Sequence, residues 1–217
     1  MRTFLAAIIV LLSAAPAAHA ATTVAIEVGP IAEYGEPTIV TGTVKVDGLP
    51  APGRPVELLG RTHPFDGEYR VIARSHTIAD GGFRFTPRLA RNTDLRVRAD
   101  GAQSPRWRAY VNPAFTLDFR PRSTRKIVVI ARYQVPRSVR LTRRTLFYVA
   151  RAGAATGPVV ARAQLERRRP GRYRATATVR LPKRWHGRFR YAGCLPYSPG
   201  SGMGDPLASC PRRIRFR

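Results

Sequence analysis

The stretch that most constrains the fold is residues 77–99, where a tight turn precedes strands whose side chains alternate. In the turn Ala79–Gly82, the Asp80 side chain can accept a hydrogen bond from the backbone two residues on, and glycine tolerates a positive φ. From Leu95 to Ala99, apolar residues alternate with arginines, which is the period of a strand with one face in a core and one in solvent. This combination predicts a corner of a β-sandwich.

Turn signals rich in glycine, proline, asparagine and aspartate recur along the rest of the chain at the spacing of short strands, and no segment shows a sustained helical period. The pattern predicts an all-β chain of antiparallel strands. The expected strands include one that starts at Val56 and ends at Gly60, one made of Trp107, Ala109 and Val111, a short one over 138–141, and a long one over 173–181 that is followed by a turn at Trp185-His186. A further strand is expected over 126–133. It is apolar on both faces at 127–131 and is therefore either central in its sheet or covered by the neighbouring domain.

The two halves of the chain repeat an order of segments. VIARSHTIADGGFRF (71–85) matches VVARAQLERRRPGRYRA (159–175), and NTDLRVRA (92–99) matches HGRFRYAG (186–193). In the second copy a basic turn, ERRRPG at 166–171, stands where the first has its Asp-Gly turn. We therefore expect two tandem antiparallel β-sandwich domains, at 21–112 and 113–217, joined so closely at Asn112-Pro113 that they form an elongated, semi-rigid pair.

The segments YGE, VTGTV, GRPVEL, TIADGGFRF and NTDLRVRA resemble the bacterial immunoglobulin-like β-sandwich repeats of secreted and surface proteins. TIADGGFRF is also similar to the carboxypeptidase-regulatory, transthyretin-like sandwich. The resemblance covers residues 34–99 well and the second half loosely. It implies an immunoglobulin-like fold and a surface location, and it carries no catalytic residue.

The first 20 residues have the features of a cleaved signal peptide. Met1-Arg2 supplies a positive start, 4–13 is a short apolar run, and Ala18-His19-Ala20 fits the small-x-small cleavage rule. The apolar run is shorter than the roughly 20 residues of a membrane span, and no later segment comes close. These features predict a secreted, extracellular protein that associates with the cell surface without a covalent anchor.

Positive charge is concentrated in the second half. The chain carries 38 Lys and Arg against 13 Asp and Glu, a net charge of +25. Residues 1–100 hold 11 basic and 10 acidic side chains, whereas 101–217 hold 27 and 3. A genome that favours arginine codons explains why only three of the cations are lysines, but it does not explain why acidic residues are scarce in one half only.

Arginine suits anion binding because its planar fork matches phosphate and carboxylate. Any single arginine can be explained by the need for polar side chains on outward strand positions, but the imbalance as a whole favours a binding surface. The residues predicted to bind anions are Arg143, Arg144, Arg167, Arg168, Arg169, Arg172 and Arg174. The expected partners are anionic wall polymers, lipid head groups or another surface protein, with nucleic acid a less favoured polyanion.

Cys194 and Cys210 are the only cysteines, and in an exported chain they are expected to form a disulfide. They bracket the loop 195–209, which is too rich in proline and glycine for a strand or a helix. The loop has two interpretations of about equal weight: a recognition tip carried by a rigid sandwich, or a long loop that needs a brace.

Neither a metal site nor a catalytic site is predicted. His63, His76 and His186 match no ligand spacing, Asp66-Gly67-Glu68 has too few oxygen ligands for calcium, and no nucleophile elbow is present. The sequence therefore predicts a secreted, non-enzymatic protein without a cofactor, whose arginine-rich second domain associates with anionic envelope polymers. The alternative is an accessory subunit of a surface assembly that docks through a sheet edge at 212–217.

Overall fold

A computed structural model describes residues 21–29, 31–181, 188–198, 200–205, 207, 210 and 213–215. The predicted signal peptide, 1–20, and the predicted turn at Trp185-His186 lie outside the described residues. The described chain consists of strands, turns and loops without a helix, so the all-β prediction is confirmed. Consequently, within these residues no helix has the length and apolar character needed to cross a membrane.

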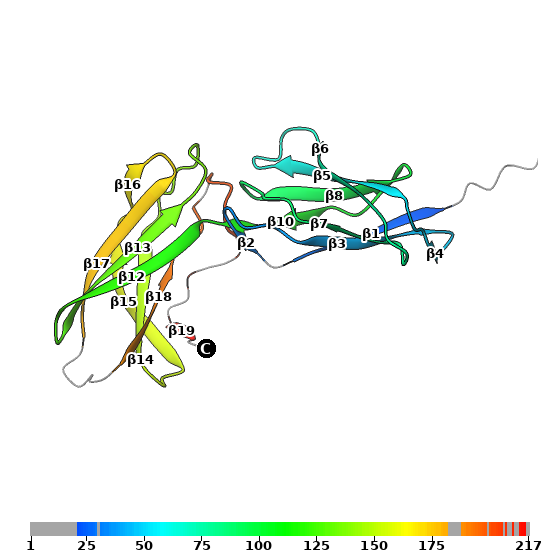
Figure 1. Ribbon diagram of the computed structural model, residues 1–217. Helices are drawn as coiled ribbons and strands as arrows, with labels where there is room; N and C mark the ends of the chain where they lie inside the picture. The colour runs from blue at the N-terminus through cyan, green and yellow to red at the C-terminus, as the bar shows by residue number, and fades with distance from the viewer. Residues whose placement is uncertain are drawn as a thin grey trace, which may run out of the picture.

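The strands up to residue 112 form two main sheets (Figure 1). In one, β3 lies between β1 on one side and β4 and β7 on the other; the second has the order β10-β8-β5-β6, with β9 beside β8. A short pair, β2 with β11, is parallel, and the other pairs are antiparallel. The strands are β1 (Thr22–Val28), β2 (Ala32–Glu33), β3 (Val40–Val46), β4 (Leu49–Pro50), β5 (Pro55–Thr62), β6 (Arg70–His76), β7 (Gly82–Phe85), β8 (Thr93–Ala99), β9 (Ala102–Gln103), β10 (Trp107–Ala109) and β11 (Val111–Asn112).

The strands after residue 112 form two further antiparallel sheets, with the orders β12-β13-β17-β16 and β18-β14-β15-β19. As predicted, β13 is a central strand, because it pairs with β12 on one edge and β17 on the other. The strands are β12 (Ala114–Ser123), β13 (Lys126–Gln134), β14 (Thr145–Arg151), β15 (Thr156–Ala163), β16 (Glu166–Arg169), β17 (Arg172–Arg180), β18 (Phe189–Cys194) and β19 (Arg213–Arg215).

The repeat seen in the sequence corresponds to a repeat of strand pairing. The pairs β1-β3, β3-β7, β5-β6 and β5-β8 recur in the same chain order as β12-β13, β13-β17, β14-β15 and β14-β18, all antiparallel. The halves differ at the end of the chain, since β10 pairs with β8 whereas β19 pairs with β15. Paired antiparallel sheets of this kind are consistent with the predicted β-sandwich.

The turn at Asp80 carries the chain from one sheet to the other. It follows β6 of the second sheet and leads into β7, which pairs with β3 of the first. Gly81 has a φ of 74°, and the Asp80 Oδ1 atom accepts a hydrogen bond of 2.8 Å from the Gly82 N–H. A Cβ atom at Gly81 would lie 2.5 Å from the Val44 carbonyl oxygen, so glycine is required there both by conformation and by space.

Four local predictions were wrong. β5 continues past Gly60 to Thr62, and residues 138–141 form a turn and loop in which Val139 and Leu141 are buried. The expected strand at 107–111 is divided, because β10 pairs with β8 while β11 pairs with β2. The expected basic turn at 166–171 is the edge strand β16 followed by a tight turn at Pro170-Gly171.

Apolar side chains from facing sheets fill the interior. In the first half these include Val24, Val44, Val56, Leu58, Phe83, Phe85, Leu95 and Val97; in the second they include Val129, Ala131, Tyr133, Phe147, Val149, Tyr173, Ala175 and Val179. On β8, the buried Leu95, Val97 and Ala99 alternate with Arg96 and Arg98, as the sequence pattern predicted. On β17, inward-facing apolar residues alternate with outward-facing arginines and threonines.

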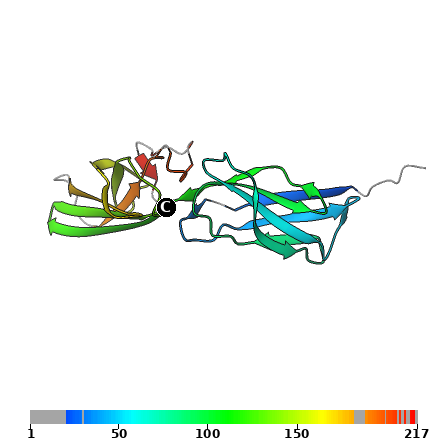
Figure 2. The ribbon, with the colours of Figure 1, turned by 90° about the horizontal axis from the view of Figure 1, so that it is seen from above.

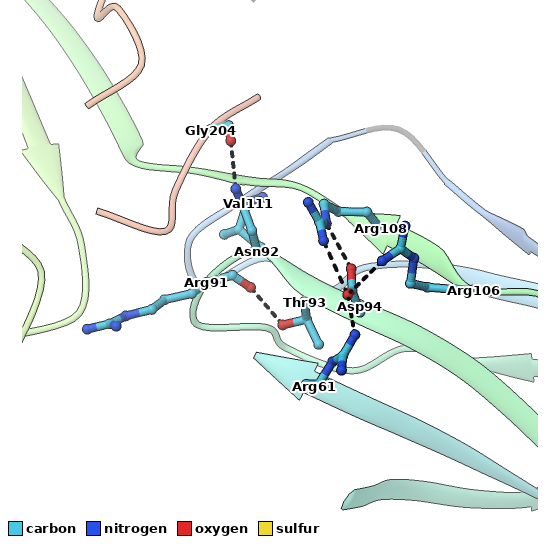
Figure 3. Close-up of polar contacts among 9 residues, drawn as sticks. All are labelled: Arg61, Arg91, Asn92, Thr93, Asp94, Arg106, Arg108, Val111 and Gly204. Carbon is cyan, nitrogen blue, oxygen red and sulfur yellow. Dashed lines mark hydrogen bonds and ion pairs between the residues drawn. The ribbon is translucent and has the colours of Figure 1, made fainter. Parts of the chain in front are cut away.

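The two halves lie end to end, and only Pro113 separates β11 from β12 (Figures 1 and 2). A second connection comes from the loop after β18, which packs against the first half. The backbone N–H of Asn92 donates to the Gly202 carbonyl at 2.7 Å, and its side-chain Nδ2 donates to the Gly204 carbonyl at 2.7 Å. The Asn92 Oδ1 atom in turn accepts from the Val111 N–H at 2.9 Å (Figure 3).

The disulfide closes this loop at its base. Cys194, at the end of β18, is bonded to Cys210 with a Cα–Cα separation of 5.8 Å, so the predicted cysteine pair is formed. Within the loop, Ser198, Ser201 and Met203 are buried, and the Gly204 N–H donates to the Val111 carbonyl at 2.7 Å. The described part of the loop therefore packs against the first half of the same chain, which is not the arrangement of a free recognition tip.

Candidate anion-binding groove

Four arginines surround a hollow of about 700 Å³ on the outer face of the sheet β12-β13-β17-β16. Strand register explains the arrangement. Arg132 of β13 pairs with Arg174 of β17, and Gln134 pairs with Arg172 one step further on. Alternate residues of a strand share a face, so the side chains of these two cross-strand pairs project from the same side of the sheet. Arg168 of β16 completes the cationic lining from the neighbouring edge strand.

A second hollow of about 480 Å³ adjoins the first. It is lined by Arg137, Arg169 and the Pro170-Gly171 turn, and it shares Gln134 and Arg172 with its neighbour. Residues of the first half form part of both walls, because Glu33 of β2 lines the first hollow and Tyr34 lines the second. We call the two hollows together the arginine groove.

Few of these guanidinium groups are neutralised. Arg168 lies 2.8 Å from Glu166 and Arg132 lies 3.5 Å from Asp118, both in solvent-exposed pairs that contribute at most about 1 kcal/mol. Among the described residues, Arg137, Arg169 and Arg172 have no acidic or hydrogen-bonding partner. The groove therefore presents a cluster of guanidinium donors with unused hydrogen-bonding capacity, which is the chemistry that binds phosphate or carboxylate oxygens.

The arginines predicted to bind anions divide into two groups. Arg168, Arg172 and Arg174 line the first hollow and Arg169 lines the second. The other three line neither hollow: Arg143 and Arg144 are exposed before β14, where the Arg144 Nε atom donates to Gln164 at 3.2 Å, and Arg167 pairs in register with the buried Tyr173. Arginines that are consecutive in the sequence therefore do not all line the groove.

Arg132, Gln134 and Arg137 are not among the residues predicted from the sequence to bind anions. Arg132 and Gln134 lie at the end of β13, after the stretch 127–131 that is apolar on both faces, and Arg137 lies in the loop that follows. A signal was available, because Arg132 and Gln134 alternate with Tyr133 and so share the outward face of that strand.

A different arginine cluster surrounds a buried acid in the first half (Figure 3). Asp94 of β8 has a side chain with 0% exposure; its carboxylate accepts hydrogen bonds from Arg108 at 2.8 Å and Arg61 at 3.2 Å, with Arg106 3.7 Å away. Aromatic rings cover these cations, with Arg61 stacked on Tyr69 and Arg108 on Phe65. These guanidinium groups are already occupied by the carboxylate and the rings, so the cluster is a structural centre.

Burial by itself would raise the pKa of Asp94. The hydrogen bonds from Arg108 and Arg61 outweigh it and hold the pKa below the ordinary value for aspartate. The Asp94 carboxylate is consequently charged at neutral pH, and it raises the pKa of Arg108 in return.

The described residues include no group of three or more His, Cys, Asp or Glu side chains that could hold a metal ion. Burial, together with the charges of Arg91 and Arg108, lowers the pKa of His63, whose Nδ1 atom is buried without a hydrogen-bond partner among the described residues. The ring lies beside Gly202 of the loop after β18 and so belongs to the contact between the halves.

No protein-family model matches the chain, and no curated protein matches it. Among solved structures it is similar to a glycosyl hydrolase family 2 member from Bacteroides cellulosilyticus, with 12% identity and a TM-score of 0.23 over 81% of this chain. The match spans 27% of that enzyme's length. At this TM-score the similarity says nothing about activity or substrate here.

Proposed function

We propose that this chain is a secreted, non-enzymatic binding protein whose arginine-rich second half associates with anionic cell-envelope polymers. Its parts would be a signal peptide at 1–20 and two immunoglobulin-like domains at 21–112 and 113–217. The observation that carries the proposal is the arginine groove, in which six guanidinium groups meet around two adjoining hollows with Glu33 as the acidic lining residue among those described.

Physical chemistry supports the proposal in two ways. A surface with a strong excess of one charge raises the local concentration of polyanions and speeds their association. Guanidinium groups that lack an internal partner can then donate to phosphate or carboxylate oxygens without first breaking a strong contact. Arg172 meets both conditions, because it lines both hollows and has no partner among the described residues.

Replacing groove arginines is expected to weaken binding in a salt-dependent way. In the variant Arg132→Gln/Arg168→Gln/Arg172→Gln, three contacts to a phosphate-bearing polymer are lost, so the slope of log affinity against log salt should fall by about 2 to 3. The measurement is retention of the mature, disulfide-bonded protein on phosphocellulose across a salt series.

The matched control is Arg143→Gln/Arg144→Gln/Arg167→Gln, which removes the same charge from arginines that line neither hollow. It should retain most of the salt slope. An equal reduction of the salt slope in the two variants would mean that overall charge, and not the groove, governs retention. Wild-type protein that passes through the column at low salt, or whose retention ignores salt, would exclude the proposed association.

The sheet-edge alternative has one observation in its favour. β19 is at the end of the strand order β18-β14-β15-β19, so one of its edges has no neighbour in that order. An edge strand can add a strand from a partner protein. Truncation after Cys210 tests this mode: a complex recovered from the native envelope with full-length protein should be lost, and an intact complex would exclude docking through β19.

A further inference from the structure

The arginine groove is longer than one anionic group. Its cations come from three successive strands, with Arg132 on β13, Arg172 on β17 and Arg168 on β16. Neighbouring strands lie about 4.8 Å apart, so these positions span roughly 10 Å across the sheet. Along β17, Arg172 and Arg174 are two residues apart on the same face, a step of about 7 Å. A single phosphate or carboxylate can reach only the nearest one or two of these guanidinium groups.

The two hollows also share two lining residues. Arg172 and Gln134 pair across β17 and β13, and both line the first and the second hollow. A polymer ligand that lay along the groove would pass over this pair, from the arginines at 132, 168 and 174 to those at 137 and 169. Arg172 would donate to an anionic group at the centre of the path, and the Gln134 amide would offer a neutral donor beside it.

We propose that the arginine groove takes an extended linear polyanion, one whose phosphate or carboxylate groups recur along the chain, with Arg172 as its central contact. This inference rests on the proposed function and adds to it the binding of several successive groups of one polymer and the residue at the centre of the contact. Successive anionic groups on one chain bind as linked contacts, so the second and third groups bind at a high effective concentration. The site accordingly discriminates by the length of the polyanion as well as by its charge.

The test is a length series measured by titration calorimetry at low salt with the full mature protein, its disulfide intact. The probes are orthophosphate, tripolyphosphate and long-chain polyphosphate, compared at equal phosphate concentration. Affinity per phosphate should rise by about tenfold or more from orthophosphate to the long chain. A parallel series of galacturonate oligomers shows whether carboxylates are accepted as well, and binding in only one series identifies which anionic group the groove takes.

Arg172→Gln should lower long-chain affinity by about tenfold, the effect of one charge-assisted hydrogen-bonding contact, and should leave orthophosphate binding nearly unchanged. Arg143→Gln is the matched control and should change neither. Both side chains are exposed, so neither substitution opens the core.

The possible failures can be told apart. Absence of binding to every probe would overturn the proposed function and this inference together. Binding that does not depend on length would overturn the inference alone, because separate groups would then occupy separate arginines. A length dependence reduced equally by Arg172→Gln and Arg143→Gln would place the polymer on diffuse surface charge and also overturn it.

Discussion

Asp94→Asn is expected to destabilise the protein by about 2 to 3 kcal/mol, less than the cost of breaking a fully buried ion pair, because the Arg61 and Arg108 side chains keep 27% and 34% exposure and can be hydrated. The carboxylate has no solvent exposure and is the common acceptor for Arg61 and Arg108. An asparagine there would leave these guanidinium groups without a counter-charge and would turn an amide donor toward them. Since domains are typically stable by about 5–15 kcal/mol, the loss should be evident as a lower midpoint in denaturant unfolding.

The pH dependence gives a second readout for Asp94. Its pKa is lower in the folded protein than in the unfolded chain, so its contribution is complete above the ordinary aspartate pKa and is lost as pH falls through the folded value. The free energies of unfolding of wild type and Asp94→Asn should therefore differ most near neutral pH and become equal in acid. A difference in the free energy of unfolding that stays constant down to low pH would contradict this prediction.

Glu57→Gln is the matched control, because Glu57 accepts from Arg74 and Arg98 on the same face of the same sheet but in solvent-exposed pairs. Exposed pairs contribute little, so this variant should unfold close to wild type. An equal loss of stability in Glu57→Gln and Asp94→Asn would show that burial of the Asp94 carboxylate has no special effect.

Asn92→Ala is expected to cost about 2 to 4 kcal/mol and to loosen the contact between the halves. The substitution removes the donor to the Gly204 carbonyl and leaves the Val111 N–H without its acceptor. Both lost contacts are buried, and each buried polar group left unpaired costs about 1–3 kcal/mol. Thermal unfolding measures the stability, and limited proteolysis within 195–205 measures release of the loop.

The comparison variant is Asn112→Ala, which makes the same change at an exposed asparagine of the same junction. It should leave both the unfolding temperature and the rate of cleavage in the loop near wild type. If Asn92→Ala were cleaved no faster than Asn112→Ala, the loop would be held by the disulfide and its own packing without help from Asn92.

Much of the architecture could be predicted because it depends on local periodicity. The alternation at Leu95–Ala99 and at 173–181 predicted strands with one buried face, and the Asp80 turn predicted a connection of the kind observed. The repeat between 71–99 and 159–193 predicted the recurring order of strand pairs. These features follow from residues close together in the sequence, whose spacing decides which side of a strand they occupy.

Local periodicity did not predict strand boundaries that depend on a distant partner. Glycine at position 60 predicts a strand end, but Gly60 pairs with both Arg70 and Leu95, so β5 continues through it. The ERRRPG segment has the composition of a turn, but it forms the edge strand β16 because β17 lies beside it. In both cases hydrogen bonds to another segment outweighed the local preference.

The sequence by itself determined the all-β class, the cysteine pair and the excess of arginine after residue 100, since these follow from composition and from the spacing of neighbouring residues. Only the tertiary structure decided which arginines meet. Register between β13 and β17 brings Arg132 beside Arg174, and the irregularity of β16 between Arg167 and Arg169 adds Arg168, whereas Arg143 and Arg144 remain outside the groove. The same holds for Asn92 and Gly204, which are 112 residues apart in the chain and are joined by a hydrogen bond. The physical reason is that a strand's own residues specify its faces, but which strand lies beside it depends on the packing of the whole chain.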